Sequence, residues 1–249
     1  MTAVCDAQAF AEAAKRMTCL GELTGLLDEV ARELGFDCVT LMHHPRRAAP
    51  GQPLIAFSTY PESFVAMALE RRYVADDPVL VACERRVAPF DWSEAPRLVA
   101  MTERRREILE AAAASGLRRG LTIPIHAPGE PPGSCSFAVL GDRELPAGAR
   151  QAAHWVGAFA FEQARRMLGL GVGAHGRPRL SPRQLDCLVW AGRGKSDAAI
   201  AVILGLSPET VREHMAAARA RYGVATRQQL MSACLQDGQL TFADLMGRD

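Results

Sequence analysis

Residues 180–234 constrain the fold of this chain more than any other stretch of its sequence. Two runs with apolar residues at helical spacing meet there at the short turn Gly205-Leu206-Ser207. Each run has its own start signal, because Ser196 and Ser207 both stand where an N-cap is favoured. Two capped helices joined by a turn of this length predict a helix-turn-helix, whose second helix can enter the major groove of DNA.

A further helix is predicted in front of this pair. It begins with Ser181-Pro182-Arg183-Gln184, which has the spacing of a capping box. In such a box the serine hydroxyl accepts the backbone N–H three residues later, and the glutamine side chain accepts the serine N–H. Proline is tolerated at the first helical position, so the spacing predicts a helix that starts at Pro182.

The last helix of the helix-turn-helix carries the candidate DNA contacts. Its apolar spacing predicts a buried stripe of Val211, Met215, Ala218 and Tyr222, with the other side facing outward. Arg212 lies one turn in and is expected to reach a base edge, preferably a guanine. The arginines nearer the helix end, or beyond it, are expected to contact phosphates. The candidate DNA-binding residues are Thr210, Arg212, Glu213, Arg219, Arg221 and Arg227. The alternative is a solvated face on a helical bundle that binds a protein partner.

Charge is divided unevenly along the chain. Residues 177–235 hold nine Lys and Arg against four Asp and Glu, a net charge of +5. Residues 1–176 hold 19 against 21, a net charge of −2. A basic part joined to a mildly acidic one is typical of a DNA-binding module on a domain that does not bind DNA, although an ordinary solvated surface can also carry +5.

Composition excludes several classes of protein. With 249 residues, 49% apolar and 23% charged, the chain is expected to be soluble and globular. It has no uncharged apolar run of 18 residues and no basic start of a secretory signal, so we expect no membrane span and a cytoplasmic location. The seven cysteines are scattered without a Cys-x-x-Cys pair, which predicts reduced thiols and neither disulfides nor a metal site.

The first 168 residues alternate helical patterns with short β-rich runs. Apolar spacing predicts helices over residues 7–34, 62–72, 78–83, 102–115 and 148–168. Strands are predicted over residues 38–42, 54–58, 120–126 and 134–140, with a strand or turn at 88–92. This order predicts a mixed α/β sandwich. Four glycines and a proline in residues 169–178 predict a linker between domains of residues 1–168 and 179–249.

Both parts of the chain resemble one family. The C-terminal motifs Leu180-Ser-Pro-Arg-Gln, Leu204-Gly-Leu-Ser and Thr210-Val-Arg-Glu-His resemble the LuxR-type helix-turn-helix. They depart from it at Gln184, where the family usually has Glu, so the capping is kept but a favourable charge at the helix start is lost.

The N-terminal part resembles the autoinducer-binding domain of LuxR-type quorum-sensing regulators, including orphan members. The resemblance rests on Tyr60-Pro61, Tyr73-Val-Ala-Asp-Asp77-Pro-Val, Trp92 and Gly116-Leu-Arg-Arg-Gly-Leu-Thr122-Ile-Pro. It implies an α+β fold, in which an α-β-α sandwich around a small antiparallel sheet precedes an all-α helix-turn-helix domain.

The resemblance also implies a ligand, an acyl-homoserine lactone, and the residues that hold it. Asp77 would accept the amide N–H of the ligand. Tyr60 and Ser136 would hydrogen-bond the region of the acyl carbonyl, with Thr122 nearby, and Trp92 would pack on the lactone ring. Each residue has a simpler interpretation by itself, since Asp before Pro is commonly a cap and Trp is commonly core.

Two ligand positions depart from the family. Phe64 and Ala68 stand where members usually carry Trp and Tyr. Phe64 has no N–H for a lactone carbonyl, and an unmet polar group in a closed pocket costs roughly 1–3 kcal/mol. We therefore expect an unusual lactone, a different small molecule, or action without a ligand.

The expected function is that of a ligand-responsive transcription regulator. It would bind palindromic promoter DNA as a homodimer, because one helix reads too few bases to be specific. RNA polymerase is a further partner that the resemblance implies, and no cofactor is expected. The alternatives are a ligand-independent regulator with a degenerate pocket, and an enzyme with a helical appendage. The enzyme is disfavoured because no histidine has a metal-like partner at i, i+4 or a nucleophile motif beside it.

Overall fold

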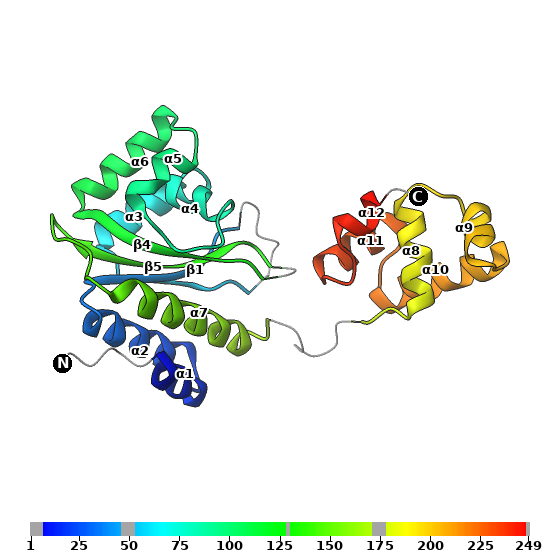
Figure 1. Ribbon diagram of the computed structural model, residues 1–249, viewed down its shortest axis with the longest axis horizontal. Helices are drawn as coiled ribbons and strands as arrows, with labels where there is room; N and C mark the ends of the chain where they lie inside the picture. The colour runs from blue at the N-terminus through cyan, green and yellow to red at the C-terminus, as the bar shows by residue number, and fades with distance from the viewer. Residues whose placement is uncertain (1–6, 46–52, 128–129, 171–177, 248–249) are drawn as a thin grey trace. The chain divides into compact units, whose positions relative to one another are not determined.

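The computed structural model describes residues 7–45, 53–127, 130–170 and 178–247 (Figure 1). The chain forms two compact units, whose boundary in the sequence lies between residues 172 and 173. Most of the predicted linker, residues 171–177, lies outside the described residues. Each unit has a hydrophobic core of its own.

A five-stranded antiparallel sheet organises the N-terminal unit. Its strands are β1 (Cys38–His43), β2 (Ala56–Ser58), β3 (Phe90–Asp91), β4 (Leu117–Ile125) and β5 (Gly133–Leu140), in the order β2-β1-β5-β4-β3. The central strand β5 is buried from Gly133 to Val139. Both sides of this strand are buried because helices cover both faces of the sheet (Figure 1), so that Ser134 and Ser136 are buried together with its apolar residues.

Two helices pack on one face of the sheet, α2 (Leu20–Glu33) and α7 (Ala149–Met167), and a third, α1 (Ala7–Arg16), packs against these two helices. Helix α7 approaches closely because Gly157 has no side chain; a Cβ there would stand 2.8 Å from the Cβ of Cys135. The prediction of one helical stretch over residues 7–34 was wrong at its middle. The helix is interrupted between α1 and α2, where Thr18 donates its N–H and its hydroxyl to Glu22 in the first turn of α2, at 2.7 and 3.0 Å.

Short helices cover the other face: α3 (Glu62–Glu70), η1 (Tyr73–Ala75), α4 (Pro78–Cys83), η2 (Trp92–Glu94), α5 (Ala95–Leu98) and α6 (Glu103–Ala114). The helix predicted over residues 62–72 ends at Glu70, because Arg72 takes a left-handed conformation with φ of 53°. Strand β3 has only two residues, and Trp92 starts η2 instead of ending a strand.

The C-terminal unit is all helical, with α8 (Pro182–Gly192), α9 (Asp197–Leu204), α10 (Pro208–Tyr222), α11 (Arg227–Gln236) and α12 (Phe242–Met246). The predicted capping box of α8 is confirmed, since Ser181 Oγ accepts the N–H of Gln184 and Gln184 Oε1 accepts the N–H of Ser181. Gly205, at φ of 65°, ends α9 and makes the turn into α10. Helix α12 was not predicted.

The predicted fold class is therefore confirmed: an α-β-α sandwich is followed by a helical unit with a helix-turn-helix. Among the described residues, none of the helices has the length and apolar character needed to cross a membrane.

Candidate functional site

A cavity of about 730 Å³ lies between the sheet and the layer from α3 to α6. Cavities that hold small molecules typically measure about 300–1,000 Å³. Its walls are mostly apolar, and they come from β1, β2, β4 and β5 on one side and from the helices on the other. The predicted ligand residues that line it are Tyr60, Phe64, Ala68, Asp77, Trp92 and Ser136. Thr122, the remaining one, is fully buried behind this lining.

A row of hydroxyl groups crosses the sheet beside the cavity. Ser58 pairs with Thr40, Thr40 with Ser136, and Ser136 with Thr122, on four neighbouring strands. Directly paired residues point to the same face of a sheet, so these side chains share the cavity side. Sequence reasoning missed Thr40 and Ser58, because only the strand register brings them into the row.

The row continues into the helical layer through Trp92. Its Nε1–H donates to Thr122 Oγ1 at 2.9 Å, and the hydroxyls of Thr122 and Ser136 are 2.8 Å apart. If the Thr122 hydroxyl donates its hydrogen bond to Ser136 Oγ, the Ser136 hydroxyl can donate into the cavity. The chain of hydrogen bonds thus fixes the indole ring and presents a donor to a ligand.

The position of the indole depends on Gly120. A Cβ at Gly120 would stand 2.3 Å from the Trp92 ring, closer than any real contact. Gly120→Ala is therefore expected to displace the Trp92 ring and to break its hydrogen bond to Thr122. The substitution should lower the free energy of unfolding by about 1–3 kcal/mol. Thermal unfolding and tryptophan fluorescence check this.

Gly25→Ala is the matched control, because a Cβ there would meet nothing within 4 Å. Gly25 lies inside helix α2, so the same substitution should stabilise the protein, by about 0.5–1 kcal/mol. Equal effects of the two variants would contradict the role given to Gly120.

Asp77 supplies the acceptor of the cavity. It is the N-cap of α4 and accepts the N–H of Val79 at 2.8 Å. Burial raises the pKa of its carboxyl to about 6, against the opposing effect of backbone N–H groups of Val79 and Leu80. The cap interpretation and the ligand interpretation are thus compatible, because the carboxylate has a second oxygen that can accept another hydrogen bond.

Aromatic rings enclose the part of the cavity near Asp77. The Tyr60 ring stands 6.1 Å from Trp92, edge to face, and 6.4 Å from Phe64. Burial raises the pKa of Tyr60, so its hydroxyl stays protonated and can donate. Phe64 contributes only carbon, and Ala68 leaves room where a larger side chain would fill space.

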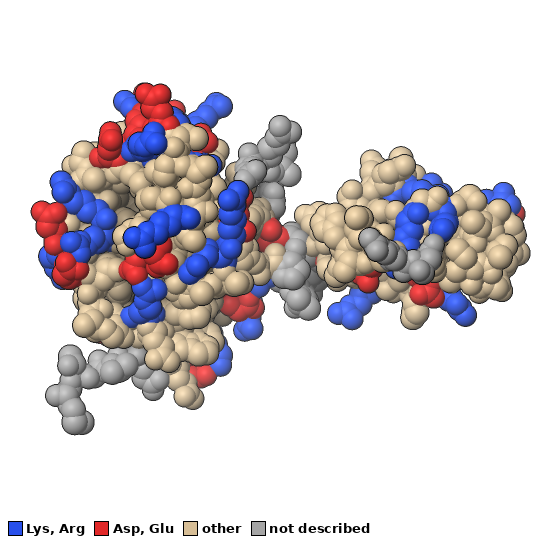
Figure 2. Space-filling model, turned by 45° about the horizontal axis from the view of Figure 1, so that its top comes forward, with Lys and Arg blue, Asp and Glu red and all other residues tan. Residues whose placement is uncertain are grey.

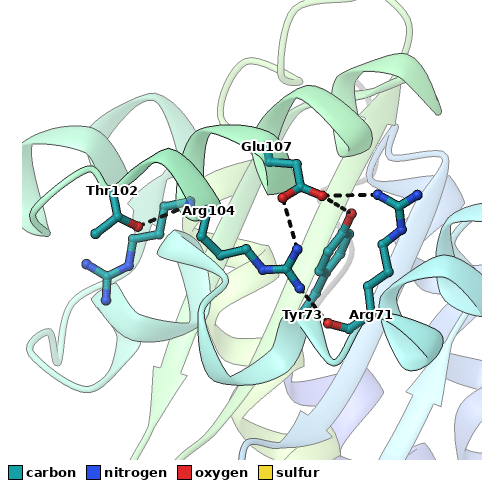
Figure 3. Close-up of polar contacts among 6 residues, drawn as sticks. Arg71, Tyr73, Thr102, Arg104 and Glu107 are labelled. Carbon is teal, nitrogen blue, oxygen red and sulfur yellow. Dashed lines mark hydrogen bonds and ion pairs between the residues drawn. The ribbon is translucent and has the colours of Figure 1, made fainter.

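A cluster of ion pairs braces the helical wall (Figure 3). Glu107 of α6 accepts from Arg104 at 2.9 Å and from Arg71 at 3.0 Å, with the Tyr73 hydroxyl 3.5 Å away. Arg104 also lies over the Tyr73 ring, 4.9 Å from its centre, and donates to the carbonyl of Arg71. Tyr73, which lines the cavity, is thereby held between α6 and the turn that follows α3.

The neighbouring histidines 43 and 44 are structural. His43 Nδ1 accepts the N–H of Ile55 at 3.0 Å, and His44 Nε2 lies 2.8 Å from Ser134 Oγ. Burial lowers the pKa of His44 to about 3, so it is neutral at ordinary pH. Their hydrogen bonds join the strands instead of serving a reaction centre.

Helix α10 presents the candidate DNA-binding surface. Val211, Met215 and Ala218 are buried as predicted, and Tyr222 is half-buried with its hydroxyl bonded to Asp237. Arg212 is exposed and pairs with Glu209 on the same helix, at 2.6 Å. Thr210 is half-buried, and its hydroxyl forms a hydrogen bond with the hydroxyl of Ser207, whereas Glu213 is exposed.

The other three candidate arginines have partners inside the C-terminal unit. Arg219 is half-buried and donates to the carbonyl of Ala225. Arg221 donates to the carbonyl of Arg179, and Arg227 pairs with Asp197 at 2.7 Å. Their contacts with phosphate stay predictions. Figure 2 shows Lys and Arg at several separate places on the visible face of this unit, and both signs of charge interspersed on the N-terminal unit.

Comparisons with known proteins match both units. The family model for the autoinducer binding domain matches residues 20–164, and the model for bacterial regulatory proteins of the luxR family matches residues 178–234. The transcriptional activator protein BjaR1 of Bradyrhizobium diazoefficiens is 26% identical over 212 residues, covering 84% of this chain and 86% of BjaR1. The regulatory protein SdiA of Escherichia coli is 28% identical over 204 residues, covering 80% and 82% of the two chains.

Solved structures of SdiA share the fold. A crystal structure of the Escherichia coli protein has a TM-score of 0.68 at 24% identity, covering 94% of this chain and 98% of that one. A structure of SdiA in complex with octanoyl-rac-glycerol has a TM-score of 0.67 at 23% identity, covering 93% of each chain.

Proposed function

The chain belongs to the LuxR family of bacterial regulatory proteins that carry an autoinducer-binding domain, and we propose that it senses an acyl-homoserine lactone or a related acyl compound. As a DNA-binding transcription regulator it would read palindromic promoter DNA as a cytoplasmic homodimer. RNA polymerase would be its further partner.

The observation that carries the proposal is the set of polar groups in an otherwise apolar cavity. Asp77 offers an acceptor, and Ser136 and Tyr60 offer hydroxyl donors. A secondary amide needs one acceptor for its N–H and donors for its carbonyl, so the set is complementary to an acyl amide. The apolar walls would then hold the acyl chain.

Thermal unfolding of the purified protein with a panel of acyl compounds tests the proposal. The panel contains acyl- and aryl-homoserine lactones and acyl glycerols. A ligand at 100 times its dissociation constant adds about 2.7 kcal/mol, which is a shift of several degrees. No shift with any member, in a folded protein that binds its DNA, would support the ligand-independent alternative that Phe64 and Ala68 keep open.

The ring of the ligand is the part least matched by this cavity. Phe64 cannot donate to a lactone carbonyl, and the related SdiA fold accommodates octanoyl-rac-glycerol, which has no lactone ring. Both points favour a ligand whose head group is not an ordinary homoserine lactone.

Phe64→Trp combined with Ala68→Tyr is therefore expected to strengthen binding of ordinary acyl-homoserine lactones by about 10- to 100-fold. The new indole N–H supplies the missing donor and the new phenol fills the space beside Ala68. Calorimetric titration of both proteins with the same lactone measures the change, and an unchanged affinity would argue against this view of the head group.

The exposed aromatic side chains of α7 mark our proposed dimer interface. Trp155 and Phe159 are 50% and 38% exposed, and the Trp155 ring stacks with those of Phe159 and His154. Large exposed aromatic side chains are typical of interfaces.

Trp155→Glu should weaken dimerisation by at least about 30-fold, since a central anchor contributes about 2 kcal/mol or more. Sedimentation measures this, with Val87→Glu as the control at an exposed apolar residue outside α7. A dimer that tolerates Trp155→Glu would place the interface elsewhere.

A further inference from the structure

A β-bulge brings one charged side chain to the far end of the cavity. The pairing of β4 with β5 shifts register between Leu117 and Arg119, which leaves Arg118 as the extra residue. Bulges re-aim side chains and are over-represented beside functional sites. Arg118 lines the cavity, although its side chain is 55% exposed.

The far end of the cavity, beside Arg118, is separated from the row of hydroxyl groups by an apolar stretch. Four residues of β5 lead from Ser136 to Leu140, the partner of Leu117, a distance of about 13 Å at the usual rise of a strand. Ile108, Leu109 and Ala112 of α6 line the cavity from the helical side. An acyl chain anchored at Ser136 and Asp77 can therefore extend along β5 until its end reaches Arg118.

The present partner of Arg118 is weak. Its Nη1 lies 3.4 Å from Oδ1 of Asp142, and the Asp142 side chain is 87% exposed. Exposed pairs of this kind contribute little stability, so the guanidinium is available to a better-placed acceptor. A carboxylate on the ligand would meet Arg118 with a bidentate geometry and at the edge of an apolar, less hydrated wall.

We propose that Arg118 binds an acidic group at the tail of the ligand, so that the cavity selects an acyl compound whose chain ends in a carboxylate. The inference rests on the proposed function, because it assigns the amide to Asp77 and Ser136 and extends the chain from there. It adds a charged recognition point at the far end of the cavity, about 13 Å along β5 from Ser136.

Titration with matched probes tests the inference: decanoyl-homoserine lactone and decanoyl glycerol, each compared with its ω-carboxy analogue of the same number of carbons. The wild-type protein should prefer the ω-carboxy probe by about three- to tenfold, and the preference should fall as salt is added. Arg118→Gln should abolish the preference while leaving the affinity for the methyl-terminated probe within about twofold. Asp142→Asn should increase the preference, because it removes the competing carboxylate.

Arg119→Gln is the matched control, since this neighbouring arginine pairs with Glu144 and does not line the cavity. If the methyl-terminated probe binds as well as its analogue, or if Arg118→Gln keeps the preference, the tail assignment is overturned and the proposed function stands. If no probe binds and no amide or acyl glycerol of the panel stabilises the protein, both are overturned.

Discussion

Replacing Asp77 by asparagine is expected to weaken ligand binding by about 10- to 150-fold and to stabilise the ligand-free protein at neutral pH. The first effect follows because a hydrogen bond to a charged group contributes about 1.5–3 kcal/mol, and the ionised carboxylate is lost. The second follows because the wild-type carboxylate is ionised in a buried place that raises its pKa to about 6. Asparagine keeps a carbonyl oxygen for the Val79 N–H, so helix α4 retains its cap.

The pH dependence gives this prediction a distinct sign. The pKa of Asp77 is about 6 in the folded protein against an ordinary value of 3.8, so the folded state holds this proton more tightly than the unfolded chain. The stability that Asp77 contributes is therefore fully present below about pH 3.8 and is lost as pH rises through 6. Ligand affinity should change in the opposite direction, because the ligand N–H needs the ionised carboxylate.

Thermal unfolding of both proteins from pH 5 to pH 8, with and without ligand, measures the two slopes together. Between pH 5 and pH 7 the wild-type protein should lose stability relative to Asp77→Asn when ligand-free, and should gain ligand-induced stabilisation. Parallel curves for the two proteins at all pH values would show that Asp77 does not titrate in this range.

Arg212→Ala is expected to remove sequence-specific DNA binding. A bidentate contact with a guanine contributes about 1–3 kcal/mol, and a dimer on a palindrome makes it twice, so the loss is about 2–6 kcal/mol. This corresponds to a decrease in affinity of roughly 30-fold to more than 10⁴-fold. When Arg212 turns from Glu209 to the DNA, the loss of their ion pair costs little free energy, because both side chains are exposed.

Titration of specific and random DNA at several salt concentrations measures the effect. Arg212→Ala should bind both DNAs alike while the salt slope for random DNA stays the same, since a base contact releases no counterion. Arg183→Ala is the control that removes the same charge from α8, where Arg183 pairs with Asp186 on the surface. If the Arg212→Ala protein still prefers the specific DNA, other residues must contact the bases.

Local rules predicted the helical unit well. The caps of α8, α9 and α10 depend on serine hydroxyls and on the spacing of three residues, and both can be read along one stretch of chain. The same holds for the glycine that ends α9. By contrast, α12 was missed because its five residues are too few for a periodic pattern. It is held by its Thr241–Asp244 capping box and by Arg193, which follows α8 and donates to the carbonyl of Asp244.

The cavity could be predicted only in part. The resemblance pointed to Tyr60, Phe64, Ala68, Asp77, Trp92 and Ser136, all of which line the cavity. Thr40, Ser58 and Arg118 were not predicted, since their positions depend on which strands pair and on where the register shifts. The intramolecular partners of Arg219, Arg221 and Arg227 were missed for a similar reason, because the spacing of residues along a helix does not show what lies beside it in the fold.

The alternation of side chains along β1 and β5 separates two kinds of position that are one residue apart. Thr40 and Ser136 face the cavity, whereas Leu41 and Phe137 belong to the core that α2 and α7 cover. Shortening a residue of that core costs about 2–5 kcal/mol, but a change on the cavity side meets space that is already open. New ligand specificities can therefore arise by substitutions on one face of these strands while the other face continues to fold the domain. In this sheet, the choice of ligand and the stability of the domain therefore depend largely on different side chains of the same strands.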